Sequence, residues 1–211
     1  MLDLVILVAD KDMEFALRGL LTRHKSIGFH PLPDDKVKII RYSAHDSGCR
    51  ARGYELLREF GKLSSHALML FDREGCGRED PSRIELEIEV EEHLSQSGWG
   101  NNAKAIVIDP ELDIWVWSNS PHVDRILGWH GRSPCLREWL TTKGHFSEQN
   151  QVKPDRPKET LEAALRAVHK PRSSALYGKL AQIVGLARCV DPAFLKFKQT
   201  MQLWFPPEAG N

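Results

Sequence analysis

The sequence lacks long apolar segments and is poor in cysteine, and each absence excludes a class of protein. No run approaches the ~18 apolar residues that cross a bilayer. The apolar run at 4–8 lacks the basic start and the small-residue cleavage site of a signal peptide. Cys49, Cys76, Cys135 and Cys189 form no Cys-x-x-Cys pair, which argues against a disulfide framework and a zinc site. We therefore expect a cytoplasmic protein with reduced thiols and no membrane association.

The sequence also lacks a net charge, because 29 Lys and Arg balance 29 Asp and Glu. Phosphate contacts dominate nucleic-acid affinity, so the overall charge gives no indication of a polyanion partner. The charge is unevenly distributed, since residues 151–211 contain 10 basic and 5 acidic residues. An acidic front and a basic tail would suit a metal site beside a phosphate-binding face, and solvated helix surfaces would give the same asymmetry.

The sequence does contain an alternation of apolar strands and amphipathic helices. Apolar runs typical of buried strands occupy 2–8, 37–42, 66–71 and 105–108. Helical spacing predicts helices at 12–24, 51–63 and 83–94. Asp12 is the expected N-cap of the first helix. The segment 83–94 also alternates as a strand would, but a crossover between parallel strands favours a helix. The pattern predicts an α/β fold with a mostly parallel sheet and helices on both faces.

The strands end at Asp109, and helices follow. A short helix is expected after Pro134, and the polar, proline-containing segment 147–157 is expected to be a linker or loop. Three further helices are predicted at 158–169, 173–187 and 192–204. We therefore expect an α/β domain at 1–146 and a helical C-terminal extension at 147–211 that packs on the same domain.

Acidic residues follow three of the four predicted strands. Asp10, Asp72 and Asp109 stand at the strand ends. Further acids follow closely: Asp12, Glu14, Glu74, Glu111 and Asp113. Ligands of parallel α/β sheets bind beyond the carboxyl ends of the strands, where these side chains should converge and repel one another. A divalent cation would offset that repulsion, and Mg²⁺ would keep room for a phosphate oxygen. An acid after a strand is also an ordinary N-cap or turn residue, so both interpretations stay open.

The opening segment VADKDMEFALRGLL, residues 8–21, resembles the acidic cluster and first helix of the receiver domains of two-component signalling. This resemblance would make Asp72 a phosphoacceptor. The sequence departs from the receiver pattern at IVIDPE, residues 106–111, where a receiver has Ser or Thr at the end of its fourth strand. A fifth strand that ends in Lys is not evident either.

Most of the chain also resembles small bacterial proteins of the Toprim fold that are related to OLD-type nucleases. The resemblance lies in VADKDME, FDREG and IDPELDIWVW, and in the tail segments KPDRPKETLEAAL, SSALYGKLAQIV and CVDPAFLKFKQTM. Asp10 and Asp113 stand where the family usually has Glu, Glu74 replaces the second Asp of an Asp-x-Asp pair, and Lys11 replaces a glycine. Each acidic exchange keeps the charge and moves it by about one methylene, and ~1 Å of misplacement can cost about a hundredfold in rate.

The Toprim resemblance implies a Toprim-like domain with a Mg²⁺- or Mn²⁺-dependent site for phosphodiester cleavage or other nucleic-acid processing. It implies five metal ligands: Asp10, Glu14, Asp72, Glu74 and Asp113. Asp10 or Glu14 would act as general base, and Lys158 would neutralise developing charge. The resemblance also implies a role in bacterial antiviral (antiphage) defence, as in methylation-associated defence systems, with other defence proteins and nucleic acid as partners. A non-catalytic adaptor subunit of the same fold is the alternative.

Two arginines beside the acidic loop, Arg73 and Arg78, have two interpretations. They could hold backbone phosphates of a nucleic acid, or they could be ordinary solvated loop charges. The tryptophans Trp115 and Trp117 are expected in the core rather than in a base-stacking platform, because aromatic side chains bury large areas.

Overall fold

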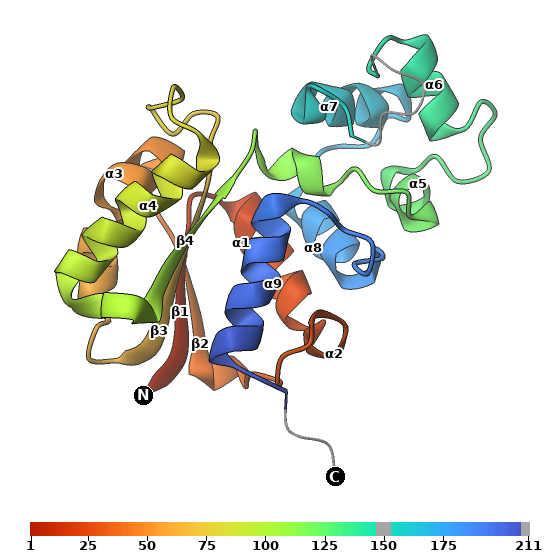
Figure 1. The fold of residues 1–211 in the computed structure, drawn as a ribbon. Coiled ribbons are helices and arrows are strands. Elements are labelled where there is room, and N and C mark those ends of the chain that lie inside the picture. The colour runs from red at the N-terminus through yellow and green to blue at the C-terminus, as the bar shows by residue number, and fades with distance from the viewer. Residues whose placement is uncertain (147–152, 208–211) are drawn as a thin grey trace.

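The structure is a computed structural model that describes residues 1–146 and 153–207. Its centre is one sheet of four parallel strands in the order β2-β1-β3-β4. The strands are β1 (Leu2–Val8), β2 (Val37–Arg41), β3 (Ser64–Asp72) and β4 (Ala103–Ile108). β1 and β3 are central and almost entirely buried, as their unbroken apolar runs predict. All four carboxyl ends meet at one edge of the sheet (Figure 1).

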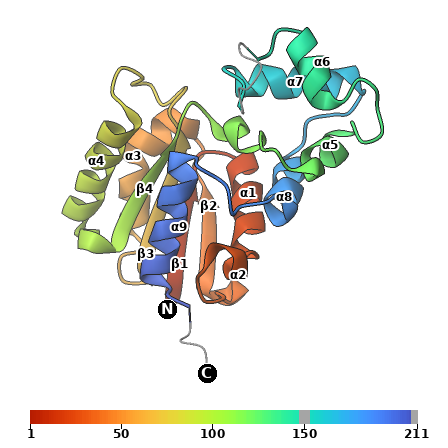
Figure 2. The same cartoon turned by 45° about the vertical axis from the view of Figure 1, so that its right-hand side comes forward.

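Helices cover both faces of the sheet (Figures 1 and 2). One face carries α1 (Lys11–Leu21) and α9 (Pro192–Trp204), and the other carries α3 (His45–Arg58) and α4 (Arg83–Leu94). The prediction of an α/β fold with a mostly parallel sheet, helices on both faces and a helical C-terminal extension is confirmed, and this architecture is consistent with a Toprim-like fold. α9 comes from the extension and lies directly on the sheet beside β4.

The first helix begins earlier than the sequence predicts. Its N-cap is Asp10 rather than Asp12, and the Asp10 carboxylate accepts a hydrogen bond from Met13 N at 2.8 Å. The backbone therefore turns into α1 directly after β1, because Asp10 satisfies one of the free N–H groups of the first turn. The same residue that ends the strand also begins the helix, which holds its carboxylate at the sheet edge.

The ambiguous segment 83–94 forms α4, as predicted. Ser82 caps the helix and Glu85 reaches back to the Ser82 backbone, which makes a capping box. The buried residues Leu86, Val90 and Leu94 lie on one side, and helical spacing explains them better than alternation does. The segment forms a helix despite its alternating pattern, because the parallel strands β3 and β4 need a crossover connection between them.

The outer edge of β4 is covered by acidic side chains of α4. Glu87 accepts a hydrogen bond from Val107 N at 3.0 Å, and Glu91 accepts one from Ala105 N at 3.2 Å. Lys196 of α9 contacts both carboxylates, at 3.1 Å and 2.7 Å. The N–H groups of the edge strand are therefore satisfied by carboxylates that are themselves ion-paired.

The remaining longer helices either extend beyond the carboxyl edge of the sheet, as a group that we call the arm, or pack against α1. The arm, which extends away from the sheet in Figures 1 and 2, contains α5 (Pro121–Leu127), α6 (Leu136–Thr142) and α7 (Pro157–Ala167). α8 (Ser174–Ile183) packs against α1. Short elements complete the described chain: α2 (His24–Ile27), η1 (Asp34–Lys36), η2 (Ser95–Trp99), η3 (Gly100–Asn102) and η4 (Leu112–Trp115). Of the expected loop at 147–157, residues 147–152 lie outside the described residues.

The helices of the C-terminal half follow the predictions closely, although α2 and α5 were not expected. None of the helices in the described ranges combines the length and the apolar character that crossing a bilayer requires. Trp117 is buried in the core, as predicted, and donates from Nε1 to the carbonyl oxygen of Pro157 at 3.1 Å. Trp115 is only partly buried.

α1 and α8 approach each other through two glycines. A Cβ atom on Gly19 would stand 2.6 Å from the carbonyl oxygen of Gly178, and one on Gly178 would stand 3.2 Å from the carbonyl oxygen of Phe15. Only residues without a side chain allow the two backbones to come this close. The C-terminal end of α8 is also held, because Arg23 donates to the carbonyl oxygens of Ala181 and Val184.

Candidate functional site

Asp72, the last residue of β3, is buried at the carboxyl edge of the sheet. Its Oδ1 accepts a hydrogen bond from Leu112 N at 2.9 Å, and its own backbone N donates to Asp46 Oδ1 at 2.8 Å. These contacts tie the strand end to η4 on one side and to the start of α3 on the other. The position of Asp72 is thus fixed by the backbone N–H of Leu112 and by the side chain of Asp46.

Four carboxylates, one from each strand end, form what we call the Asp72 cluster: Asp10, Asp46, Asp72 and Glu111. Burial raises the pKa of Asp72 well above its ordinary range, and the negative charges of Asp46, Asp10, Glu111 and Asp113 raise it further. Burial also raises the pKa of Asp10 and of Asp46, and the proximity of Asp10 adds to the rise at Asp46. The cluster therefore brings mutually repelling carboxylates together at a partly buried place, where burial disfavours the charged form.

Asp46 was not among the sequence-predicted site residues. It lies in the first turn of α3, five residues after β2 ends, whereas the sequence predicts that this helix starts at residue 51. Asp46 therefore falls in a predicted loop, outside the predicted site. One sequence signal points to Asp46. Like the other three strands, β2 is followed by an acid, which lies in the first turn of the next helix.

Glu111 connects the cluster to the arm. It is buried, and burial together with the nearby Asp113 raises its pKa to about 7, against the opposing effect of Lys158. The backbone N of Lys158 donates to Glu111 Oε1 at 3.2 Å, and Lys158 Nζ lies 3.9 Å from Oε2. The first turn of α7 therefore contacts the cluster, and the sequence-predicted Lys158 reaches it with a half-exposed side chain.

A second group of acids at the same edge is fully paired. We call it the Arg172 network: Asp12, Asp113, Arg172, Ser174 and Tyr177. Arg172 lies 3.1 Å from Asp113 and 3.2 Å from Asp12. Tyr177 donates its hydroxyl to Asp113 at 2.7 Å, and Ser174 donates to Asp12 at 2.6 Å. Burial raises the pKa of Asp113, and the contacts with Tyr177 and Arg172 oppose that rise.

The structure places the five sequence-predicted metal ligands in different surroundings. Asp10 and Asp72 lie in the Asp72 cluster, whereas Asp113 lies in the Arg172 network. Glu14 contacts Arg18 at 2.9 Å and Arg41 at 3.0 Å. Glu74 is exposed at the rim, close enough to Glu111 to contribute to the raised pKa of that residue.

The two arginines of the acidic loop brace the loop itself. Arg73 donates to the carbonyl oxygens of Pro81 and Glu79, at 3.1 Å and 2.6 Å, and lies 3.4 Å from Asp109. Arg78 lies 2.5 Å from Glu89. Both guanidinium groups therefore have partners within the protein before any phosphate arrives.

The Asp72 cluster suits a hard divalent cation in its chemistry. Carboxylate oxygens are the ligands of Mg²⁺ and Mn²⁺, and a bound cation would offset the mutual repulsion. The geometry is less complete. Within residues 1–146 and 153–207, no group of three or more His, Cys, Asp or Glu side chains is placed to hold one ion. Mg²⁺ is usually held by one or two carboxylates and retains several waters, so the cluster can still supply a site of that kind.

The receiver interpretation gains little from this geometry. Asp72 is buried and its Oδ1 is bonded to Leu112 N, whereas a phosphoacceptor must present its carboxylate to a phosphodonor. β4 ends in Ile108, without a Ser or Thr, and the described residues contain no fifth strand.

A comparison of the chain with known protein families, with curated proteins and with solved structures finds no match.

Proposed function

We propose that the Asp72 cluster binds a divalent cation, Mg²⁺ or Mn²⁺, and that this edge of the sheet cleaves or processes phosphodiesters of a nucleic acid. One observation carries the proposal. Buried Asp72 has four acidic neighbours that raise its pKa, and no basic residue is among the main groups that shift it. Buried structural carboxylates normally have a cation or hydroxyl partner, as Asp113 does, and a buried carboxylate whose charged neighbours are other carboxylates is typical of a binding site.

The residues of the cluster would divide the work. Asp10, Asp46 and Asp72 are the candidate metal ligands, with one or two of them in direct contact and the others bonded to metal-bound water. A bound cation would polarise the phosphodiester and lower the pKa of water. Glu111 would accept a proton, since its pKa of about 7 leaves it partly ionised at neutral pH. Lys158 would contact the phosphate, because its ammonium group is half exposed beside Glu111.

This assignment of metal ligands leaves out Glu14, Glu74 and Asp113 of the sequence-based set and adds Asp46. The Glu14 carboxylate forms ion pairs with Arg18 and Arg41. The Asp113 carboxylate forms an ion pair with Arg172 and accepts a hydrogen bond from Tyr177. Asp46 takes a place in the set, because its carboxylate contacts the backbone of Asp72 directly. Glu74 remains a rim residue that could contact water around the cation.

The biological role that we propose rests on the Toprim resemblance alone. We propose that the protein serves in bacterial antiphage defence together with other proteins of the defence system. The zero net charge supports a partner that contributes part of the nucleic-acid affinity, because phosphate contacts dominate that affinity. Phage challenge of cells that carry the intact system, or the same system with Asp72→Asn, tests this role. Equal protection by both would contradict a role of the site in defence.

The test of the cation site is calorimetric titration of Mn²⁺ and of Mg²⁺ into the wild type, Asp72→Asn and Asp46→Asn. Asp109→Asn is the matched control, since Asp109 follows β4 at the same edge and its exposed carboxylate has Arg73 as partner. We expect saturable binding to the wild type and the control, with affinity reduced at least tenfold in the other two variants. Binding should release protons, because the carboxylates ionise fully when a cation arrives.

The catalytic part is tested by cleavage of single- and double-stranded DNA and RNA oligonucleotides with Mn²⁺. We expect cleavage by the wild type and none by Asp72→Asn. Cation binding without cleavage would favour the second candidate, a non-catalytic adaptor subunit. The observation that supports this candidate is that three carboxylates are not placed to hold one ion within the described residues. If cations fail to bind even when oligonucleotide is present, the proposed cation site is wrong.

A further inference from the structure

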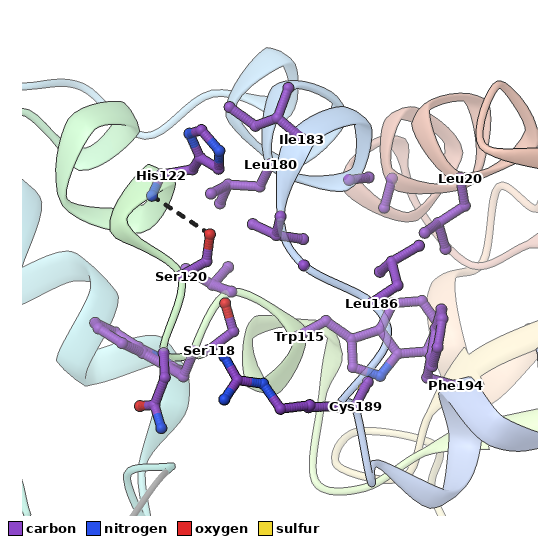
Figure 3. Close-up of a pocket in the computed structure, with 18 of the residues that line it drawn as sticks. Leu20, Trp115, Ser118, Ser120, His122, Leu180, Ile183, Leu186, Cys189 and Phe194 are labelled. Atoms are coloured by element: carbon purple, nitrogen blue, oxygen red, sulfur yellow. Dashed lines mark hydrogen bonds between the residues drawn. The ribbon is translucent and has the colours of Figure 1, made fainter. Parts of the chain in front are cut away.

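A cavity of about 530 Å³ lies on the other side of η4 from the Asp72 cluster. One wall is the segment 115–122, which leads into α5, and the other is the segment 184–190 between α8 and α9. α1 and α8 contribute the floor through Leu20 and Leu180. Figure 3 shows these walls facing each other across the space. Cavities of ~300–1,000 Å³ hold small molecules.

The body of the cavity is apolar. Its lining includes the aliphatic side chains Leu20, Leu180 and Leu186 and the aromatic rings of Trp115 and Phe194. Ile183 and Val190 also line it, and both are exposed to solvent, at 40% and 80%. An apolar ligand would cover this exposed surface as well as the interior, and burial of apolar area is the main source of affinity in such a space.

Polar groups gather on one wall without partners. Ser118 Oγ and His122 Nδ1 are buried, and neither has a hydrogen-bond partner among the described residues. Ser118, Ser120 and His122 follow one another along this wall in Figure 3. A buried polar atom without a partner costs about 1–3 kcal/mol of stability. A polar ligand group beside either atom would supply the missing partner.

The cavity also contains one cation that is free. Arg188 lines the cavity and makes no hydrogen bond or ion pair with any other residue that the structure describes. Lys153 lines it too, but its ammonium group lies 2.7 Å from Asp191 Oδ2, and Trp115 Nε1 donates to the same carboxylate. The positive charge of Lys153 is therefore neutralised, whereas that of Arg188 is available to an incoming anion.

We propose that this cavity binds a small amphipathic acid, with its apolar body between Leu20, Leu180 and Phe194 and its anionic head at Ser118 and Arg188. The proposal does not depend on the cation site. The two places meet at η4, where Leu112 lines the cavity while its N–H bonds to Asp72, and Tyr177 of α8 lines the cavity while its hydroxyl bonds to Asp113. A molecule in the cavity would contact the side chains of these two residues and none of the cluster carboxylates.

The test uses the straight-chain acids hexanoate, octanoate and decanoate, with decanol as the uncharged probe, in calorimetric titrations of the full chain. We expect the acids to bind with an affinity that rises about fourfold with each added methylene, because burial of one methylene contributes about that factor. Arg188→Gln should weaken decanoate binding about tenfold and leave decanol binding unchanged. Arg125→Gln is the matched control, since Arg125 is an exposed arginine of α5 that does not line the cavity.

Leu186→Trp provides a second test, because a larger side chain on the 184–190 wall fills the space. Binding of decanoate and of decanol should both be lost in this variant, whose fold is checked by thermal unfolding. If it does not fold, the Arg188→Gln result still decides. Absence of chain-length dependence, or equal loss of decanoate affinity in Arg125→Gln and Arg188→Gln, would overturn the proposal. Asp72→Asn should bind decanoate as the wild type does, so that failure here and failure of the cation site are distinguishable.

Discussion

The carboxyl edge of the sheet contains two groups of acids that differ in their partners. In the Arg172 network, the buried Asp113 receives hydrogen bonds from Tyr177 and Arg172. In the Asp72 cluster, the equally buried Asp72 is surrounded by other carboxylates. In the first arrangement the buried acid has partners, and removal of one partner would leave an uncompensated buried charge. The second costs stability in the protein alone, and this difference identifies the cluster, rather than the network, as the candidate site.

Removal of Arg172 should have the largest effect on this comparison. Arg172→Ala leaves buried Asp113 without its cation, and we expect the free energy of unfolding to fall by about 3 kcal/mol, as for other broken buried pairs. Urea unfolding measures this loss. Arg18→Ala is the control, because Arg18 pairs with Glu14 at the surface and should change stability by less than about 1 kcal/mol. Equal effects of the two substitutions would show that the network is not a stabilising element.

A substitution at the α1–α8 contact should disturb the Arg172 network indirectly, by moving α8. Gly19→Ala places a Cβ atom 2.6 Å from the carbonyl oxygen of Gly178, so α8 must shift away from α1. α8 carries Tyr177 and Ser174 to their acidic partners, and we expect a loss of about 2 kcal/mol, typical of overpacking. Thermal unfolding checks this. Gly185→Ala, with open space around the new Cβ, should be close to neutral, and a comparable loss there would remove the steric explanation.

An Asp-to-Asn substitution should change the free energy of unfolding in opposite directions in the two groups. Asp113→Asn weakens the bonds to Arg172 and Tyr177 and should lower the free energy of unfolding by about 2 kcal/mol, the range of hydrogen bonds to charged groups. Asp72→Asn keeps the acceptor for Leu112 N and removes a repelling charge. In metal-free buffer at about pH 8 we expect it to raise the free energy of unfolding by about 1 kcal/mol. Destabilisation by both substitutions would contradict our distinction between the groups.

The smallest effect that we expect is a change in pH dependence. The pKa of Glu111 is raised from 4.5 to about 7, so the folded protein binds this proton more tightly than the unfolded chain. Stability contributed by the protonated form is therefore present at low pH and is lost as the pH rises through about 7. Glu111→Gln should flatten this decline in a series of thermal unfolding measurements without metal. An unchanged slope would mean that Glu111 titrates normally.

The fold followed from the sequence because its signals are local. β1 occupies the residues 2–8 that its apolar run indicates, and α9 occupies 192–204 as its spacing predicts. The capping box of Ser82 and Glu85 settles the one segment that could be read in two ways. Each of these signals depends on neighbours within a few residues, and tertiary contacts did not override them.

The site followed from the sequence only in part. The rule that acids at parallel strand ends converge located Asp10 and Asp72 correctly at one edge. The rule could not tell which acids have partners, because Arg172 reaches Asp113 across 59 residues of sequence and Arg41 of β2 reaches Glu14 of α1. Asp46 was missed because its helix begins earlier than its apolar residues indicate. Pairing depends on tertiary contacts, and composition and spacing contain no record of these.

The covered edge of β4 has a consequence for assembly. An exposed edge strand is a template on which another chain can add a strand, which is a common route to aggregation. Here an incoming strand would have to displace Glu87 and Glu91 from Val107 and Ala105, and also break the contacts of both acids with Lys196. Self-association by strand addition is therefore blocked at β4. The other edge, β2, carries the charged side chains Lys38 and Arg41, and charged side chains at an edge strand also disfavour the addition of another strand.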